Sequence, residues 1–289
     1  MHGLIRNTTL LFLTCILIFS TVSSQTKKVF KFEIKEEIAP PIVRTTKLAF
    51  KQAADIKADL ILIEMDTYGG HVDAADEIRT IILDSKIPVW VFVQNNAASA
   101  GSFISIACDS IYMKPGATIG ASTVVNQNGE KLGEKYQSFM RSRMRSTAEQ
   151  NGRNPDIAEA MVEWTKPIPG FEDSGKVVSL TVKEAIKYDF CDGEYITIED
   201  LLVGEGMGNY ELIEYKETTI SSIIKFFLNP AISGILISII ILSIFAEIKT
   251  PGLGISSVIA FIAAATLGFI CLRILTSDSE RSASLAIIF

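Results

Sequence analysis

The chain has 289 residues and a formal net charge of −6, with 27 basic side chains against 33 acidic ones. The charges are mixed along the chain and form no basic stripe, so we expect no nucleic-acid partner. The four cysteines lack metal-ligand spacing, and only one histidine, His71, follows the first 24 residues. We therefore expect neither a metal site nor a cofactor.

The first 24 residues have the layout of a secretory signal peptide. Arg6 provides a basic start, an apolar run extends from Leu10 to Phe19, and small residues follow at positions 22–24. The run is shorter than the roughly 20 residues that cross a bilayer. We therefore predict that residues 1–24 are cleaved and that the remainder is exported, with an uncleaved N-terminal anchor as the alternative.

Residues 25–218 are predicted to form one soluble α/β domain. Apolar and charged residues alternate over 30–34, which predicts a half-buried strand, and Pro40 and Pro41 open a helix that extends to about residue 54. Continuous apolar runs predict further strands at 60–63, 89–93 and 111–113, and the first two are each followed by a turn and a helix. This alternation favours βαβ units on a largely parallel sheet.

Two helices are predicted in the second half of this domain. Apolar residues recur at helical spacing after position 136, and the expected inward face is Phe139, Met140, Met144 and Ala148. Asn154 is expected to cap the next helix, with an inward face of Ile157, Ala160, Met161 and Trp164. A strand at 177–180 and a helix at 182–188 follow.

Residues 219–289 are predicted to be a membrane region. The segments 226–246 and 255–272 carry no charge and are long enough to span a bilayer, and a turn containing Pro251 connects them. With the signal peptide, these spans would place the soluble domain on the extracytoplasmic side of the membrane. Burial of both segments in a soluble core is the alternative.

Two tight turns carry the strongest chemical signal in the sequence. Gly69 and Gly70 follow one predicted strand, and the segment 97–101, Ala-Ala-Ser-Ala-Gly, follows the next. Such a bend would expose the hydroxyl of Ser99 beside the backbone N–H groups of Ala100 and Gly70, while Gly69 permits the turn. Two such donors form an oxyanion hole for acyl transfer. A tight packing turn without catalytic function is the alternative.

A serine nucleophile requires a base. His71 directly follows Gly70, which would place it on the oxyanion turn and not across from the Ser99 hydroxyl, so the sequence favours a solvated loop histidine over a base. Lys135 lies at the start of a predicted helix, where burial and the helix dipole would both favour a neutral amine. Glu130 and Glu134 would instead stabilise its charge, so a solvated surface lysine is the alternative.

Three segments resemble the protease domain of NfeD-family membrane proteins, which are relatives of ClpP and of signal peptide peptidase A. These segments are 62–70, 97–101 and the Gly-Arg-Asn sequence at 152–154. The resemblance implies a ClpP/crotonase-like ββα spiral followed by two transmembrane helices, in a homo-oligomer. The family commonly has a proline where Tyr68 stands.

The same resemblance implies a serine–lysine dyad, which matches Ser99 and Lys135. The activity it implies is that of a membrane-anchored serine endopeptidase cleaving apolar segments of membrane-associated proteins, with stomatin-like proteins among its partners. Two alternatives remain open. One is a catalytically inactive membrane scaffold, and the other is an acyl-CoA enzyme on the same fold, against which the predicted export argues.

Overall fold

The computed structural model describes residues 26–126, 128–164, 168, 177–217, 226–227, 230–249, 258–260, 262–265 and 268. It divides into two units, residues 1–215 and 216–289, which are considered separately. The predicted signal peptide, residues 1–24, lies outside the described residues and stays a prediction.

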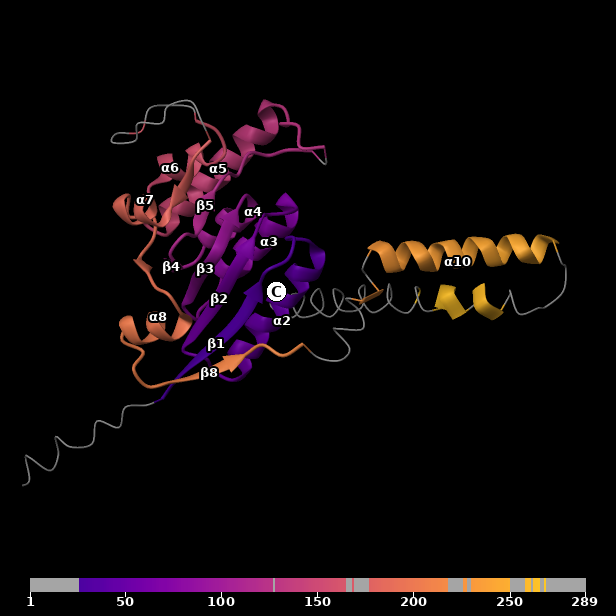
Figure 1. Cartoon of the computed structure of the whole chain (residues 1–289), viewed down its shortest axis with the longest axis horizontal. Helices are drawn as coiled ribbons and strands as arrows, with labels where there is room; N and C mark the ends of the chain where they lie inside the picture. The colour runs from indigo at the N-terminus through magenta and orange to yellow at the C-terminus, as the bar shows by residue number, and fades with distance from the viewer. Residues whose placement is uncertain are drawn as a thin grey trace, which may run out of the picture. The chain divides into compact units, whose positions relative to one another are not determined.

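The first unit is built on one sheet (Figure 1). Its strands are β1 (Lys27–Ile34), β2 (Leu60–Thr67), β3 (Val89–Ala98), β4 (Ser110–Met113), β5 (Thr118–Gly120), β6 (Ser179–Thr181), β7 (Gly193–Glu194) and β8 (Tyr210–Glu214). The order is β6-β5-β3-β2-β1-β8, and β4 pairs with β3 and β7. All pairs are parallel except β5 with β6. The predicted largely parallel α/β sheet is confirmed.

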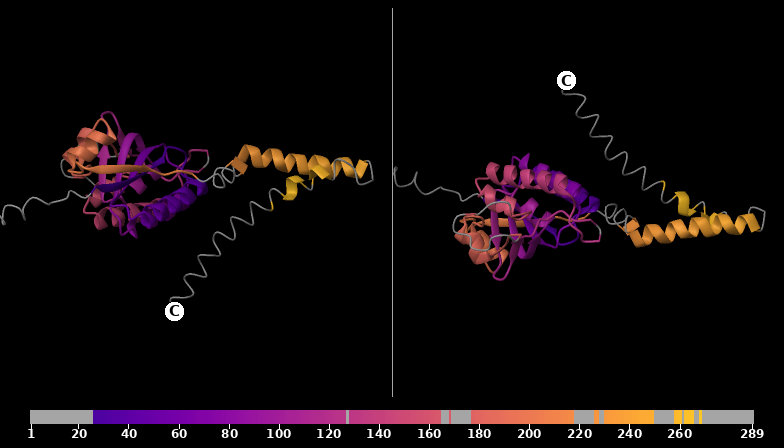
Figure 2. Two further views of the ribbon diagram at one scale, coloured as in Figure 1. Left: turned by 90° about the horizontal axis from the view of Figure 1, so that it is seen from below. Right: turned by 90° about the horizontal axis from the view of Figure 1, so that it is seen from above.

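Helices cover the sheet unequally on its two faces. They are α2 (Pro40–Asp55), α3 (Val72–Leu83), α4 (Ala100–Ser105), α5 (Glu134–Gln150), α6 (Pro155–Ala160), α7 (Val182–Lys187) and α8 (Ile198–Gly204). Figure 2 shows α2, in indigo, and α8, in orange, on opposite sides of the sheet. Since side chains alternate along a strand, Phe30 and Phe32 join the larger core under α2, while Val29 joins a smaller core under α8.

The predicted elements of the first unit agree with the structure except in a few places. Strands β2 and β3 run on to Thr67 and Ala98, up to the two candidate turns. Elements β5, β7, α8 and β8 are not predicted by the sequence. The inward placement of Phe139 is wrong, since its side chain is 56% exposed, while Met140 and Met144 are buried as predicted. Gln137 is fully buried in the same helix because the loop before it supplies hydrogen-bond partners.

The second unit contains helix α10 (Pro230–Lys249), which overlaps the predicted span 226–246. Most of the predicted span 255–272 lies outside the described residues. Within the residues that are described, no helix combines the length and the apolar character needed to cross a membrane. The two predicted spans are therefore not confirmed.

Candidate active site

Ser99 occupies a strained turn between β3 and α4. Its backbone has φ 54° and ψ −120°, a region that non-glycine residues rarely adopt and that costs about 1–3 kcal/mol. Strand-to-helix turns of this kind present a nucleophilic serine at the top of a sheet in hydrolases. The predicted bend at Ser99 is therefore present, with backbone strain that the sequence does not reveal.

Buried hydroxyl groups hold this strained backbone in place. The Ser99 N–H donates to the Gly120 carbonyl at 2.8 Å. The Ser99 carbonyl accepts from the Ser102 hydroxyl at 2.8 Å and from the Ser122 hydroxyl at 3.2 Å, and these two hydroxyl oxygens lie 2.6 Å apart. Ser102 and Ser122 are both buried. Two side chains that the sequence does not single out thus stabilise the conformation of Ser99.

The glycine turn after β2 packs directly against Ser99. Gly69 has φ +115°, and a Cβ atom there would lie 2.6 Å from the Ser99 Cβ and 3.3 Å from the Ala100 nitrogen. At Gly70, a Cβ atom would lie 2.2 Å from the Ile38 carbonyl oxygen. Only glycine fits either position, because any side chain would clash with backbone or with Ser99. The structure therefore brings the predicted turns together.

The backbone pairing of this turn leaves two donors unused. Ile38 donates to the Gly69 carbonyl at 2.9 Å and accepts from the His71 N–H at 2.7 Å, which fixes the turn on both sides of Gly70. In the part of the chain that the structure describes, no hydrogen bond uses the N–H of Gly70 or of Ala100. Both groups are available to a ligand, as an oxyanion hole requires.

Ser99 and Lys135 line the same cleft, which has a volume of about 840 Å³. Lys135 is in the first turn of α5, as predicted, but it is exposed, so the burial expected for it from the sequence is not observed. The cleft also has an apolar wall, formed by Val124, Val125, Leu132, Tyr136, Phe139 and Met140. His71 lies at the rim with its side chain 62% exposed, and its Nε2 is 3.7 Å from a Glu37 carboxylate oxygen. The predicted serine and lysine therefore face a common, largely apolar space.

Gln137 attaches the loop before α5 to the helix that carries Lys135. Its side-chain amide donates to the carbonyls of Val124 at 2.7 Å and Leu132 at 3.0 Å, and its oxygen accepts from the Val124 N–H at 3.2 Å. Gln137 lies three residues before Met140 and therefore on the same buried face of the helix. A polar residue at such a position is the sequence feature that could have indicated its role. Gln137 thus shapes the cleft wall next to Lys135.

The Gly-Arg-Asn sequence holds the far ends of α4 and α5 together. Gly152 ends α5 with φ +70°, and the Asn154 side chain caps α6. The guanidinium of Arg153, with a side chain only 5% exposed, donates to the backbone carbonyls of Ile106, Cys108 and Asp109. Arg153 therefore holds the C-terminal end of α5 next to the C-terminal end of α4. Helix α4 begins directly after Ser99.

The described cysteines, Cys108 and Cys191, are buried free thiols. Burial raises the pKa of Cys191 to about 12 and shifts the pKa of Cys108 in the same direction, so both stay protonated and unreactive. Over the described ranges, no group of three or more His, Cys, Asp or Glu side chains is placed to hold a metal ion. Ser99 is the candidate nucleophile that the geometry favours.

Comparison with known proteins relates this fold and site to one family. The family model described as NfeD1b, N-terminal domain, matches residues 28–215. The membrane protein NfeD1b of Bacillus subtilis is 28% identical over 243 residues, covering 83% of this chain and 55% of that protein. The membrane-bound protease PH1510 of Pyrococcus horikoshii is 30% identical over 219 residues, covering 68% of this chain and 47% of that protein.

A solved structure shows the same relationship. The 1510-N membrane-bound stomatin-specific protease, as a lysine-to-alanine mutant in complex with a substrate peptide, superposes with a TM-score of 0.60 at 27% identity. The match covers 70% of this chain and 98% of that one. This chain spans about half the length of the two curated relatives. Since the family model covers most of the chain, the chain belongs to the NfeD family through an NfeD1b N-terminal domain.

Proposed function

We propose that the chain is a membrane-anchored serine endopeptidase that uses a Ser99–Lys135 dyad. The observation that carries this proposal is the strained Ser99 turn, which faces a cleft shared with Lys135 beside two unused N–H donors. A relative that is named a membrane-bound protease supports the same reaction class. Membrane attachment, an extracytoplasmic protease domain and assembly into a homo-oligomer are parts of this proposal.

The reaction follows from the roles of these groups. The Lys135 amine acts as the base and takes the proton of the Ser99 hydroxyl as the oxygen bonds to the substrate carbonyl carbon. The N–H groups of Gly70 and Ala100 stabilise the oxyanion. The intermediate collapses with cleavage of the C–N bond, and the leaving amine takes the proton from Lys135. Water, deprotonated by Lys135, then hydrolyses the acyl ester and restores Ser99.

The apolar wall of the cleft supports an apolar peptide substrate. Exposed Tyr136 and Phe139 line the cleft together with Leu132 and Met140. Extended peptides with apolar side chains would bury this surface. We propose that the substrates are apolar segments of membrane-associated proteins, and the name of the 1510-N protease makes a stomatin-like protein the first candidate.

The test compares cleavage of an apolar peptide by the full-length protein and three variants. Ser99→Ala and Lys135→Ala should each lower kcat by about 10,000-fold, because a nucleophile and its base act as one unit. Lys86→Ala changes an exposed lysine outside the cleft and should cleave normally. A serine-directed phosphonate should label the wild-type protein and not Ser99→Ala.

Two results would contradict the proposal in different ways. Undiminished cleavage by the Ser99 or Lys135 variant would exclude the dyad. A folded wild-type protein that neither cleaves peptides nor reacts with the phosphonate would favour the inactive membrane scaffold.

A further inference from the structure

Tyr68 is an aromatic residue that the fold itself does not use. Its side chain is 83% exposed, more than that of any other large apolar or aromatic residue among those the structure describes. Over those residues, its hydroxyl forms no hydrogen bond and its ring packs against no other ring. Because the Tyr68 ring is exposed to water, it does not provide the stabilisation that a buried ring would. Its contribution to folding is therefore small.

The backbone that carries Tyr68 is nevertheless held firmly on both sides. The Thr67 hydroxyl donates to the Glu36 carbonyl at 2.8 Å and accepts from the Gly69 N–H at 3.1 Å. Gly69 in turn accepts from the Ile38 N–H at 2.9 Å. The ring therefore projects from a fixed support, and an aromatic side chain with two torsion angles loses little entropy on contact with a ligand.

Tyr68 lies where two cavities meet. One is the cleft with Ser99 and Lys135, and the other is a polar cavity of about 600 Å³. Glu37, Tyr68 and Gly70 line both. Tyr68 is therefore at the boundary between the cavities, two residues from the N–H that we assign to the oxyanion hole.

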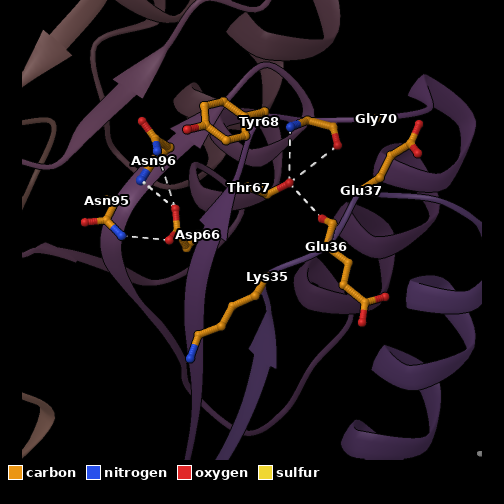
Figure 3. A pocket seen from close by; sticks show the side chains of 10 residues that line it. Lys35, Glu36, Glu37, Asp66, Thr67, Tyr68, Gly70, Asn95 and Asn96 are labelled. Atoms are coloured by element: carbon orange, nitrogen blue, oxygen red, sulfur yellow. Dashed lines mark hydrogen bonds between the residues drawn. The ribbon is translucent and has the colours of Figure 1, made fainter.

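The polar cavity lies over the ends of the strands (Figure 3). Asp66 accepts from the Asn95 side chain at 2.7 Å and from the Asn96 N–H at 3.2 Å, and Figure 3 shows these contacts next to Tyr68. The lining is otherwise polar or charged, with Lys35, Glu36 and Asp66 among its residues, so the exposed ring of Tyr68 is the apolar surface that a substrate side chain meets there. An aromatic side chain can stack on this ring, which a branched aliphatic one cannot do.

We infer that Tyr68 is a specificity-determining residue that stacks on an aromatic substrate side chain next to the scissile bond. This inference rests on the proposed protease function. A substrate carbonyl held by Gly70 and Ala100 has its flanking residue beside Tyr68. Stacking of two aromatic rings favours the aromatic peptide about 2- to 10-fold over an aliphatic one.

The test uses two peptides that share one apolar sequence and differ only in having Phe or Leu next to the scissile bond, on each side in turn. For wild-type full-length protein, kcat/KM for the Phe peptide should exceed kcat/KM for the Leu peptide by about 2- to 10-fold when the varied residue is on one particular side of the scissile bond. Tyr68→Ala should lower this ratio to about 1, whereas Tyr68→Phe, which keeps the ring, should retain it. Val203→Ala alters an exposed residue on α8 outside both cavities and should also retain it.

Two failures are distinguishable. Ser99-dependent cleavage with the same ratio in wild type and Tyr68→Ala would overturn the assignment of Tyr68 and leave the protease proposal intact. Absence of Ser99-dependent cleavage in the wild type would overturn the protease proposal, and the assignment of Tyr68 with it. Because Tyr68 is exposed, its variants should unfold at the wild-type temperature, and a lowered midpoint would identify a structural role instead.

Discussion

The backbone of Gly69 lies directly against the side chain of Ser99, so that a Cβ atom at position 69 would be 3.1 Å from the Ser99 hydroxyl oxygen. The two residues follow neighbouring strands, β2 and β3, whose ends pair through Thr67 and Ala97. Because the carboxyl ends of parallel strands lie at one edge of the sheet, the oxyanion turn and the nucleophile turn are built against each other.

Replacing Gly69 with alanine should strongly lower kcat without unfolding the domain. The new methyl group would meet Ser99 at 2.6 Å, and φ +115° is unfavourable for alanine. We expect kcat to fall by about 100-fold or more, as when an oxyanion donor is lost. Gly208→Ala is the matched control, because nothing lies within 4 Å of the position that its methyl group would take. Normal kcat in folded Gly69→Ala would contradict the proposed geometry.

Removing the hydroxyls that hold Ser99 should lower kcat and leave KM nearly unchanged. Ser102→Ala and Ser122→Ala should each cost about 1 kcal/mol in the free energy of unfolding, measured in urea. The two effects should be non-additive in a double-mutant cycle, since both hydroxyls bond the same carbonyl. Ser105→Ala is the control, because its buried hydroxyl donates to the Gly101 carbonyl instead. Equal kcat in all variants would exclude a positioning role.

Arg153→Met should be the most destabilising of these substitutions. It leaves three backbone carbonyls without their charged donor, and we expect a loss of about 3 kcal/mol in the free energy of unfolding. Arg145→Met removes an ion pair with Glu159 from a side chain that is 44% exposed, so its cost should stay below about 1 kcal/mol. Similar urea midpoints for the two variants would show that the buried contacts of Arg153 contribute little.

The stability that Glu64 provides should disappear in acid. Burial by itself would raise its pKa, but Lys35 and Lys31 outweigh burial and hold the pKa below the ordinary value of 4.5. The unfolded chain therefore takes up a proton before the folded one does, so this stabilisation is present above that ordinary value and is lost as the pH falls through the lowered pKa.

The measurement is the difference in unfolding free energy between wild type and Glu64→Gln. It should be largest near about pH 6 and narrow towards about pH 3. Glu149→Gln alters an exposed residue of α5 and serves as the control. A difference for Glu64→Gln that does not change over this range would show that the lysine pairs do not stabilise the fold.

The local pattern of the sequence predicts the elements that carry the site. Alternation over 30–34 predicts β1, because side chains alternate between the two faces of a strand. The continuous apolar runs predict β2 to β4, because strands covered on both faces of a sheet are apolar throughout. The glycine pair predicts the turn after β2, since few residues other than glycine tolerate φ values such as that of Gly69. The Ala-Ala-Ser-Ala-Gly segment predicts the position of the second turn but not the positive φ of Ser99. The pairing of Ser99 with Lys135 comes from the family resemblance, and the shared cleft agrees with it.

Contacts between distant residues are decided by tertiary structure alone. Ser102 meets Ser122 across 20 positions, and Arg153 reaches the carbonyl of Ile106 across 47, so no local pattern reveals either contact. Phe139 has the helical spacing of a core residue and yet lines the cleft, while polar Gln137 is buried because distant backbone groups satisfy its amide. The spacing of apolar residues predicts which face of a helix is buried. Whether one side chain on that face contacts the core, a ligand or solvent depends on which segment of the chain packs against it.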